Sequence, residues 1–157
     1  AMVARHCRSG KGVIGAILRT GSQKKEETYI RAKALEALTF MGIDQYADTA
    51  ASNLPYGLQR RLEIARAIAS EPRVLLLDEP AAGMNPAETS KLMKDITRIK
   101  ELGIDVLLVE HDMKVVMGVC DHIVCVDHGV KIAEGNSGEI QNNPKVIEAY
   151  LGQPANQ

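Results

Sequence analysis

The apolar residues in the first part of the chain follow a helical period. Between residues 24 and 41 they recur about every 3.6 residues, which predicts an amphipathic helix that ends before Gly42. Residues 58–70 repeat the pattern and predict a second helix, with its aliphatic side chains inward and its arginines mostly outward. Residues 1–70 are therefore predicted to form a helical subdomain.

After Pro72 the pattern changes to short, continuous apolar runs. Residues 73–79 and 104–111 have the length and composition of buried strands in a parallel sheet, where both faces are covered. Residues 86–102, which begin with proline, are predicted to form the helix between these strands. Proline suits the first turn of a helix, because a backbone N–H at that position would have no acceptor within the helix.

Two further strands are predicted at residues 122–127 and 130–135, joined at His128-Gly129 by a two-residue hairpin turn. Short helices precede and follow them. The alternation of strands and helices over residues 71–157 predicts an α/β fold, with a parallel sheet and flanking helices.

The composition suits this fold and narrows the function. Hydrophobic residues make up 45% of the chain, with one Phe and no Trp, so aliphatic side chains must form the core. The net charge of −1 gives no reason to expect nucleic-acid binding. Three cysteines without a framework spacing, Cys7, Cys120 and Cys125, indicate reduced thiols in a cytosolic protein. No apolar run approaches the roughly 20 residues that span a bilayer, so direct membrane insertion is not expected.

Two carboxylates follow the first predicted strand in the sequence VLLLDEP. The carboxyl ends of parallel strands are where α/β folds bind ligands. Asp78 could hold Mg²⁺, and Glu79 could act as general base toward a water molecule. The alternative is that the strand simply ends in a polar turn.

Two other elements carry weaker signals. His111 ends the next strand and should lie close to Glu79, where it could contact a phosphate and orient water. Gly57 begins a helix, and the free N–H groups of a helix N-terminus attract anions. Taken singly, a structural histidine and an ordinary helix start are the favoured readings.

A possible metal cluster is rejected. Cys120, His122, Cys125 and His128 lie close in sequence, but strand alternation puts His122 and Cys125 on opposite faces. Buried thiols and surface histidines are the preferred interpretation, so no intrinsic metal site is predicted.

In combination, the three elements resemble the ATP-binding-cassette (ABC) ATPases. On this resemblance, the strand from Val74 to Glu79 matches Walker B with its catalytic glutamate, and His111 matches the switch histidine. The signature motif corresponds to Leu54, Pro55, Tyr56, Gly57, Leu58 and Gln59, and the D-loop to Ala82, Gly83, Met84 and Asn85. The stretches AAGMNP, EHDMKVVMGVCD and NNPKVIEAYLG are more narrowly similar to the ATPase subunits of branched-chain amino-acid importers.

The signature departs from the family pattern at several positions. Pro55 replaces the serine whose hydroxyl would meet a γ-phosphate, and Tyr56 replaces the first glycine. Leu58 stands at the glutamine position, which puts the strength of the signature in question. Asn85 stands where many relatives have aspartate, although this also suits the importer subfamily.

The printed sequence contains no G-x-x-x-x-G-K-[ST] phosphate loop. SGKG at residues 9–12 fails as one, because no buried strand precedes it and Gly12 stands where a hydroxyl should bind Mg²⁺. We therefore expect a partial P-loop NTPase-like domain: a signature-bearing helical subdomain, residues 1–70, and the carboxyl-terminal part of the RecA-like core, residues 71–157.

The resemblance also implies cofactors and partners. ATP and Mg²⁺ are the family's ligands, but the isolated chain is expected to bind them weakly and to hydrolyse no ATP. The expected partners are transporter permease subunits and a second ATPase subunit, on the cytoplasmic face of the membrane. In the family, another strand lies between those that match residues 105–109 and 122–126, and this sequence does not contain it. The strand edges left unpaired would pair with another copy, so in isolation we expect a homo-oligomer. The alternatives are a non-catalytic module or decayed gene product that binds a full-length ABC partner, and a nucleic-acid ATPase, which the charge balance disfavours.

Overall fold

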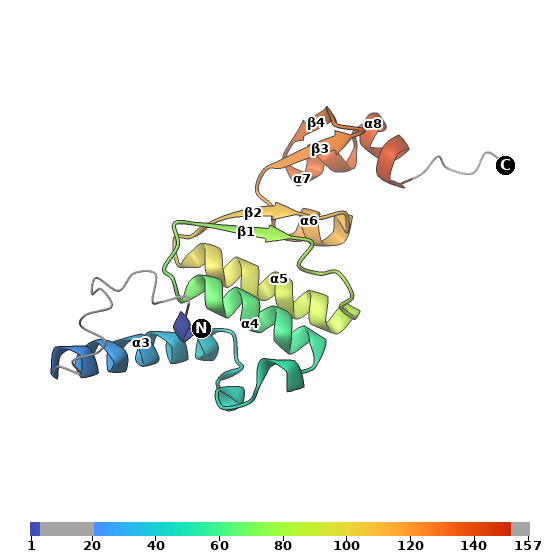
Figure 1. Cartoon of the computed structure of the whole chain (residues 1–157). Coiled ribbons are helices and arrows are strands. Elements are labelled where there is room, and N and C mark those ends of the chain that lie inside the picture. Colours follow the sequence, from blue (N-terminus) through green and yellow to red (C-terminus); the bar gives the residue numbers. More distant parts are fainter. Residues whose placement is uncertain (4–20, 152–157) are drawn as a thin grey trace. The chain divides into compact units, whose positions relative to one another are not determined.

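The structure is a computed structural model that describes residues 1–3 and 21–151 (Figure 1). It divides into two compact units. The first comprises Ala1–Leu76 and Gly83–Leu107, and the second comprises Leu77–Ala82 and Leu108–Gln157. The boundary predicted at residue 70 concerns the family's subdomains and stays a prediction.

The helix α3 (Gly21–Phe40) of the first unit ends as the sequence predicts. Gly42 adopts a left-handed backbone, with φ of +61°, which glycine reaches without steric cost. The N–H groups of Gly42 and Ile43 donate to the carbonyls of Thr39 and Leu38, both at 2.9 Å. The helix stop at Gly42 is confirmed.

Two more helices complete the core of this unit. The short turns η1 (Asp44–Tyr46) and η2 (Ala51–Asn53) lead into α4 (Tyr56–Ile68), and α5 (Pro86–Glu101) runs beside α4 in Figure 1. The α5 helix begins with proline, as predicted, and Asn85 caps it. Aliphatic side chains fill the interior; the most deeply buried are Met41, Ile43, Leu92, Ile96 and Ile99.

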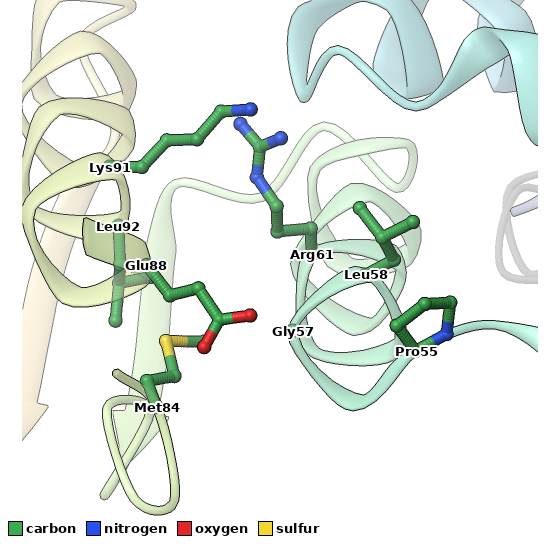
Figure 2. Close-up of a pocket in the computed structure, with 8 residues that line it drawn as sticks. All are labelled: Pro55, Gly57, Leu58, Arg61, Met84, Glu88, Lys91 and Leu92. Carbon is green, nitrogen blue, oxygen red and sulfur yellow. The ribbon is translucent and has the colours of Figure 1, made fainter. Parts of the chain in front are cut away.

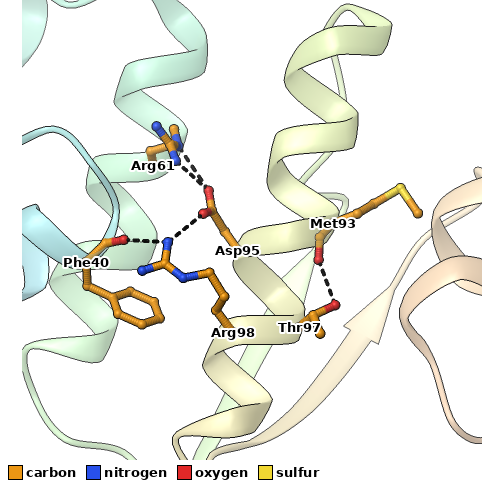
Figure 3. Close-up of polar contacts among 6 residues, drawn as sticks. All are labelled: Phe40, Arg61, Met93, Asp95, Thr97 and Arg98. Atoms are coloured by element: carbon orange, nitrogen blue, oxygen red, sulfur yellow. Dashed lines mark hydrogen bonds and ion pairs between the residues drawn. The ribbon is translucent and has the colours of Figure 1, made fainter.

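The expectation that the arginines of α4 point outward is wrong for Arg61. Its side chain is only 8% exposed and donates from Nε and Nη2 to Oδ2 of Asp95 on α5, at 3.1 and 2.7 Å (Figure 3). Arg98 adds a longer contact to the other oxygen of Asp95 and donates to the carbonyl of Phe40 at 3.0 Å. Arg61 can point inward because a carboxylate from the neighbouring helix meets it there.

The strands β1 (Val74–Asp78) and β2 (Asp105–Val109) form one sheet. The N–H of Asp105 donates to the Arg73 carbonyl near the start of both strands, and the N–H of Glu79 donates to the Val109 carbonyl at their ends, each at 2.9 Å. Start pairs with start and end with end, so the strands run parallel as predicted.

The expectation that both faces of these strands are covered is wrong for the described residues. Burial alternates along β1, with Leu75 and Leu77 buried but Val74 and Leu76 exposed. On β2, Leu107 is 57% exposed. The described chain thus covers one face of this sheet, and the continuous apolar run does not mean that both faces are buried here.

The second unit contains an antiparallel hairpin and short helices. The strands β3 (Ile123–Asp127) and β4 (Val130–Gly135) pair with a bulge between Cys125 and Val126. At the turn, His128 and Gly129 both have positive φ, +46° and +78°, as the tightest hairpin turns require. The predicted hairpin is confirmed, and β3 pairs with β4 in a sheet separate from β1 and β2.

Helices pack against one face of this hairpin. They are α6 (Met113–Val119), α7 (Ser137–Gln141) and α8 (Pro144–Val146), followed by the π-helical turn η3 (Ile147–Leu151). Their shared core consists of Val116, Ile123, Cys125, Ala133, Ile140 and Val146. Within residues 1–3 and 21–151, no helix is both long and apolar enough to cross a bilayer.

Candidate functional site

The ends of the two parallel strands bring Glu79 and His111 together, as predicted. Oε1 of Glu79 lies 3.4 Å from Nδ1 of His111, and the two side chains are 55% and 70% exposed. Asp78 is the last residue of β1 and is also exposed. Two carboxylates and an imidazole thus reach solvent at one edge of the sheet, within the second unit.

The backbone at Glu79 is in the left-handed region, with φ of +43°. Such a conformation is uncommon for a residue with a Cβ and costs about 1–3 kcal/mol. It begins a tight turn, in which the N–H of Ala82 donates to the Glu79 carbonyl at 3.1 Å. The turn directs the chain away from the sheet while the carboxylate stays at the strand end.

Glu110 is a member of this site that the sequence analysis did not single out. Its side chain is 1% exposed, and its carboxylate accepts hydrogen bonds from three backbone N–H groups, the longest of them from Asp112 at 3.5 Å. Oε1 accepts from the N–H of Ala81 at 2.9 Å, and Oε2 from the N–H of His111 at 3.1 Å. Glu110 therefore joins the turn after Glu79 to the residue that carries the imidazole. The available signal was a charged residue directly before a histidine at a strand end.

The signature segment lies in the first unit. Pro55 precedes α4, and its carbonyl accepts from the N–H groups of Leu58 and Gln59 at 2.9 and 3.0 Å. The side chain of Gln59 turns back to donate to the carbonyl of Leu54 at 2.8 Å, and Leu54 itself is buried. The helix start is thus fixed by backbone and amide contacts, because proline has no side-chain hydroxyl to cap it.

Tyr56 extends from the first turn of α4. Its hydroxyl accepts from Nε of Arg60 at 2.9 Å, and the guanidinium of Arg60 lies 5.3 Å from the ring centroid. Arg60 also pairs with Glu63 at 2.8 Å, and these two hydrogen bonds, first Glu63 and then Tyr56, raise the pKa of Arg60 above its ordinary value. Arg60 therefore remains a cation that orients the Tyr56 ring.

The D-loop residues lie in different units. Ala82 belongs to the second unit, and Gly83, Met84 and Asn85 belong to the first. Gly83 has φ of +74°, and a Cβ built there would come within 3.3 Å of the Tyr56 ring. Asn85 caps α5 by accepting from the N–H groups of Ala87 and Glu88 at 3.0 Å each. Gly83 to Asn85 are thus placed beside the signature segment.

A small pocket of about 110 Å³ lies between α4 and α5 (Figure 2). Its lining residues are Pro55, Gly57, Leu58, Arg61, Met84, Glu88, Lys91 and Leu92. Sites for drug-sized ligands measure about 300–1,000 Å³, so this pocket is too small for a nucleotide.

The described residues fit one part of a Mg²⁺–nucleotide site. Exposed oxygen donors at Asp78 and Glu79 suit Mg²⁺, which takes one or two protein carboxylates together with phosphate oxygens and water. No set of three or more His, Cys, Asp or Glu side chains in the described stretches could hold a metal ion without such additional ligands. The sequence contains no G-x-x-x-x-G-K-[ST] phosphate loop, and residues 9–12, which were rejected as one, lie outside the described residues.

The cysteines and histidines of the second unit have separate surroundings. Cys125 is buried in the hairpin core, and burial raises the pKa of its thiol. Nε2 of His122 lies 3.0 Å from Oε1 of Glu134 on the surface. The predicted buried thiol and surface histidine are confirmed at these two positions.

Comparison with known proteins identifies the family. The profile described as "ABC transporter" matches residues 5–82, and the profile "Branched-chain amino acid ATP-binding cassette transporter" matches residues 130–156. The chain belongs to the ABC transporter ATPases. The resemblance carried by Asp78-Glu79 and His111 is therefore confirmed at the level of the family.

Among the curated relatives of this ABC transporter chain is the high-affinity branched-chain amino acid transport ATP-binding protein LivG of Escherichia coli K12. It is 43% identical over 153 residues, which are 97% of this chain and 60% of the relative. BraF of Pseudomonas aeruginosa, which has the same description, is 41% identical with the same coverage. The chain thus spans about 60% of the length of these relatives.

Solved structures agree with the fold. The ADP conformation of MJ1267, an ATP-binding cassette of an ABC transporter, matches with a TM-score of 0.76 and 28% identity, over 97% of this chain and 61% of that one. A nucleotide-free ATP-binding cassette matches with a TM-score of 0.75 and 29% identity, over the same shares. The α/β, P-loop NTPase-like fold class is confirmed.

Proposed function

We propose that this chain is part of the nucleotide-binding subunit of an ABC importer for branched-chain amino acids. Its relatives LivG and BraF are described as transport ATP-binding proteins for these amino acids, and the second profile match lies on residues 130–156. The observation that carries the proposal is the 3.4 Å contact between Glu79 and His111 at the carboxyl ends of parallel strands.

Each site residue has a role in this proposal. Asp78 would hold Mg²⁺ directly or through water, Glu79 would accept the proton of the attacking water, and His111 would orient that water and the terminal phosphate. Glu110 holds the backbone on either side of them in place. The bound nucleotide supplies the phosphoryl group that is transferred to water.

The signature residues and the D-loop act toward a second subunit. Leu54 to Gln59 would contact ATP bound by that subunit, at the start of α4 where backbone N–H groups favour an anion. Permease subunits would hold the assembly at the cytoplasmic face of the membrane. The 157-residue chain alone is proposed to have no ATPase activity, because its sequence supplies no phosphate loop. It is also proposed to form a homo-oligomer, because strand edges would be left unpaired.

The first test titrates the purified chain with a fluorescent ATP analogue and Mg²⁺, beside a light-scattering measurement of its mass. No saturable binding up to millimolar nucleotide is expected. Saturable binding that Asp78→Asn abolishes would overturn the proposal that this chain lacks its own phosphate site.

The second test supplies the phosphate loop from outside. The chain is co-expressed with the N-terminal part of Escherichia coli LivG that it does not match, and ATP hydrolysis by the purified complex is measured. Activity should appear and fall by about 10²-fold or more in Glu79→Gln, as expected for loss of a general base. Glu36→Gln, which alters an exposed carboxylate on α3, should leave the activity unchanged. A well-formed complex with equal activity in Glu79→Gln and the unchanged chain would refute the role of Glu79.

A further inference from the structure

One carboxylate of the first unit touches both the signature segment and the end of the D-loop. Oε2 of Glu88 accepts from the N–H of Asn85 at 2.9 Å and so completes the capping box of α5. The other oxygen, Oε1, faces Gly57 on α4, and Figure 2 shows the carboxylate pointing toward that helix. The two contacts use different oxygens, so both can exist at once.

The contact at Gly57 requires the absence of a side chain. A Cβ built on Gly57 would lie 2.5 Å from Oε1 and 3.0 Å from the carboxyl carbon of Glu88. The N–H of Asn85 holds the other oxygen of this carboxylate at 2.9 Å, so a movement of Glu88 away from Gly57 would strain or break the capping box. Gly57 is not among the residues with positive φ, so this proximity, and not a left-handed conformation, favours glycine here.

A second contact joins the start of α4 to the D-loop, and here the side chain comes from α4 and the glycine from the D-loop. The ring of Tyr56, from the signature, lies against Gly83, from the D-loop, where an added Cβ would be 3.3 Å from the ring. Tyr56 of the signature segment thus lies against Gly83 of the D-loop, and Glu88, which follows the D-loop in the first turn of α5, lies against Gly57. Tyr56 is held by Arg60, and Glu88 is held by Asn85.

We propose that Glu88 is a positioning residue that fixes the D-loop to the signature helix through Gly57, so that the two segments move together. Its functional meaning rests on the proposed function, in which both segments meet nucleotide or the partner subunit. A displacement of α4 by nucleotide bound to that subunit would then move Asn85 as well.

The chain contains a matched control in its second unit. Glu139 forms the same capping box with Asn136 at the start of α7: the N–H of Asn136 donates to it at 2.8 Å, and Asn136 accepts from the N–H of Glu139 at 3.1 Å. The glycine that Glu139 approaches is Gly135, the last residue of β4, which directly precedes the cap residue Asn136 of the same helix. Glu139→Ala therefore removes a capping box without altering a contact between distant segments.

The first measurement is a thermal-unfolding cycle on the full chain. Gly57→Ala should lower Tm in the unchanged chain, because the new methyl group meets Glu88. In the Glu88→Ala background, Gly57→Ala should instead raise Tm by about 2 °C, since alanine is favoured over glycine in a helix wherever space permits. The same direction and size of shift in both backgrounds would overturn the proposal.

The second measurement is amide hydrogen exchange. Glu88→Ala should speed exchange at Leu58 and Gln59 on α4 by about threefold or more, in addition to loosening the start of α5. A purely capping role would confine the change to the start of α5, as Glu139→Ala should confine its change to α7. Unchanged exchange at Leu58 and Gln59 would refute the coupling. Neither measurement requires nucleotide, so a failure of the proposed function would be seen separately, in the titration and hydrolysis assays.

Discussion

The ion pair between Arg61 and Asp95 yields the strongest stability prediction. The guanidinium donates twice to one carboxylate oxygen, at 3.1 and 2.7 Å, and the two side chains are 8% and 4% exposed (Figure 3). The third nitrogen group of the guanidinium, Nη1, is buried and finds no acceptor among the residues that the structure describes. Asp95→Ala therefore leaves a buried cation with neither a counter-charge nor an acceptor.

The magnitude follows from what remains after the change. Removing one partner of a buried pair costs about 3–5 kcal/mol, because the surviving charge has lost its hydration as well as its partner. Arg98 also loses its contact with Asp95, but its side chain is 48% exposed and can be hydrated, so this loss adds less than about 1 kcal/mol. Against a typical total stability of about 5–15 kcal/mol, Asp95→Ala should severely weaken the first unit.

The assay is urea denaturation followed by far-ultraviolet circular dichroism, to which the described helices of that unit, α3, α4 and α5, contribute. The double variant Arg61→Met/Asp95→Leu should recover to within about 1 kcal/mol of the unchanged chain, because a well-packed apolar pair avoids the cost of burying charges. Glu36→Ala, which breaks the exposed pair with Lys33, serves as the control and should have no measurable effect. If Asp95→Ala loses less than about 1 kcal/mol, or if the double variant is no better than the single one, the reasoning is refuted.

Three further predictions concern the second unit. Gly129→Ala should cost about 1 kcal/mol, measured as a fall in Tm, because Gly129 has φ of +78° while no atom of the described residues, its chain neighbours aside, lies within 4 Å of the added methyl group. The hydrogen bonds from Lys131 and then His122 lower the pKa of Glu134 below its ordinary 4.5, so its stabilising contribution is complete above that pH and is lost as the pH falls through the lower folded-state pKa. Glu134→Gln should flatten this acid-side loss in melts recorded at successive pH values, and an unchanged slope would contradict the assignment. Because burial raises the pKa of the Cys125 thiol, iodoacetamide should alkylate it more slowly than a free cysteine at the same pH, as mass spectrometry would show.

Much of the fold follows from local features of the sequence. The helical period predicted α3 and α4, and the proline at the start of α5 agreed with its capped first turn. His128-Gly129 predicted the hairpin because few residue pairs accept two successive positive φ angles. The site followed as well, since the carboxyl ends of adjacent parallel strands meet at one edge and bring Glu79 close to His111.

The errors arose where a side chain's environment depends on a distant part of the chain. Arg61 looks like a surface residue by helical period, but Asp95 meets it from another helix and makes its burial possible. The apolar run at β1 was expected to be buried on both faces, yet Leu76 is 69% exposed, because coverage depends on what packs over the sheet.

The sequence by itself therefore determined the elements, their order, the hairpin turn and the meeting of Glu79 with His111, because backbone period and strand direction are encoded locally. Only the tertiary structure decided that Glu110 braces this pair, that Arg61 is buried, and that Glu88 lies against Gly57. Each of these contacts joins residues that are far apart in the chain or depends on an unpredicted side-chain direction. The free energy of such a contact is set by the distance and burial of both partners, which no local pattern specifies.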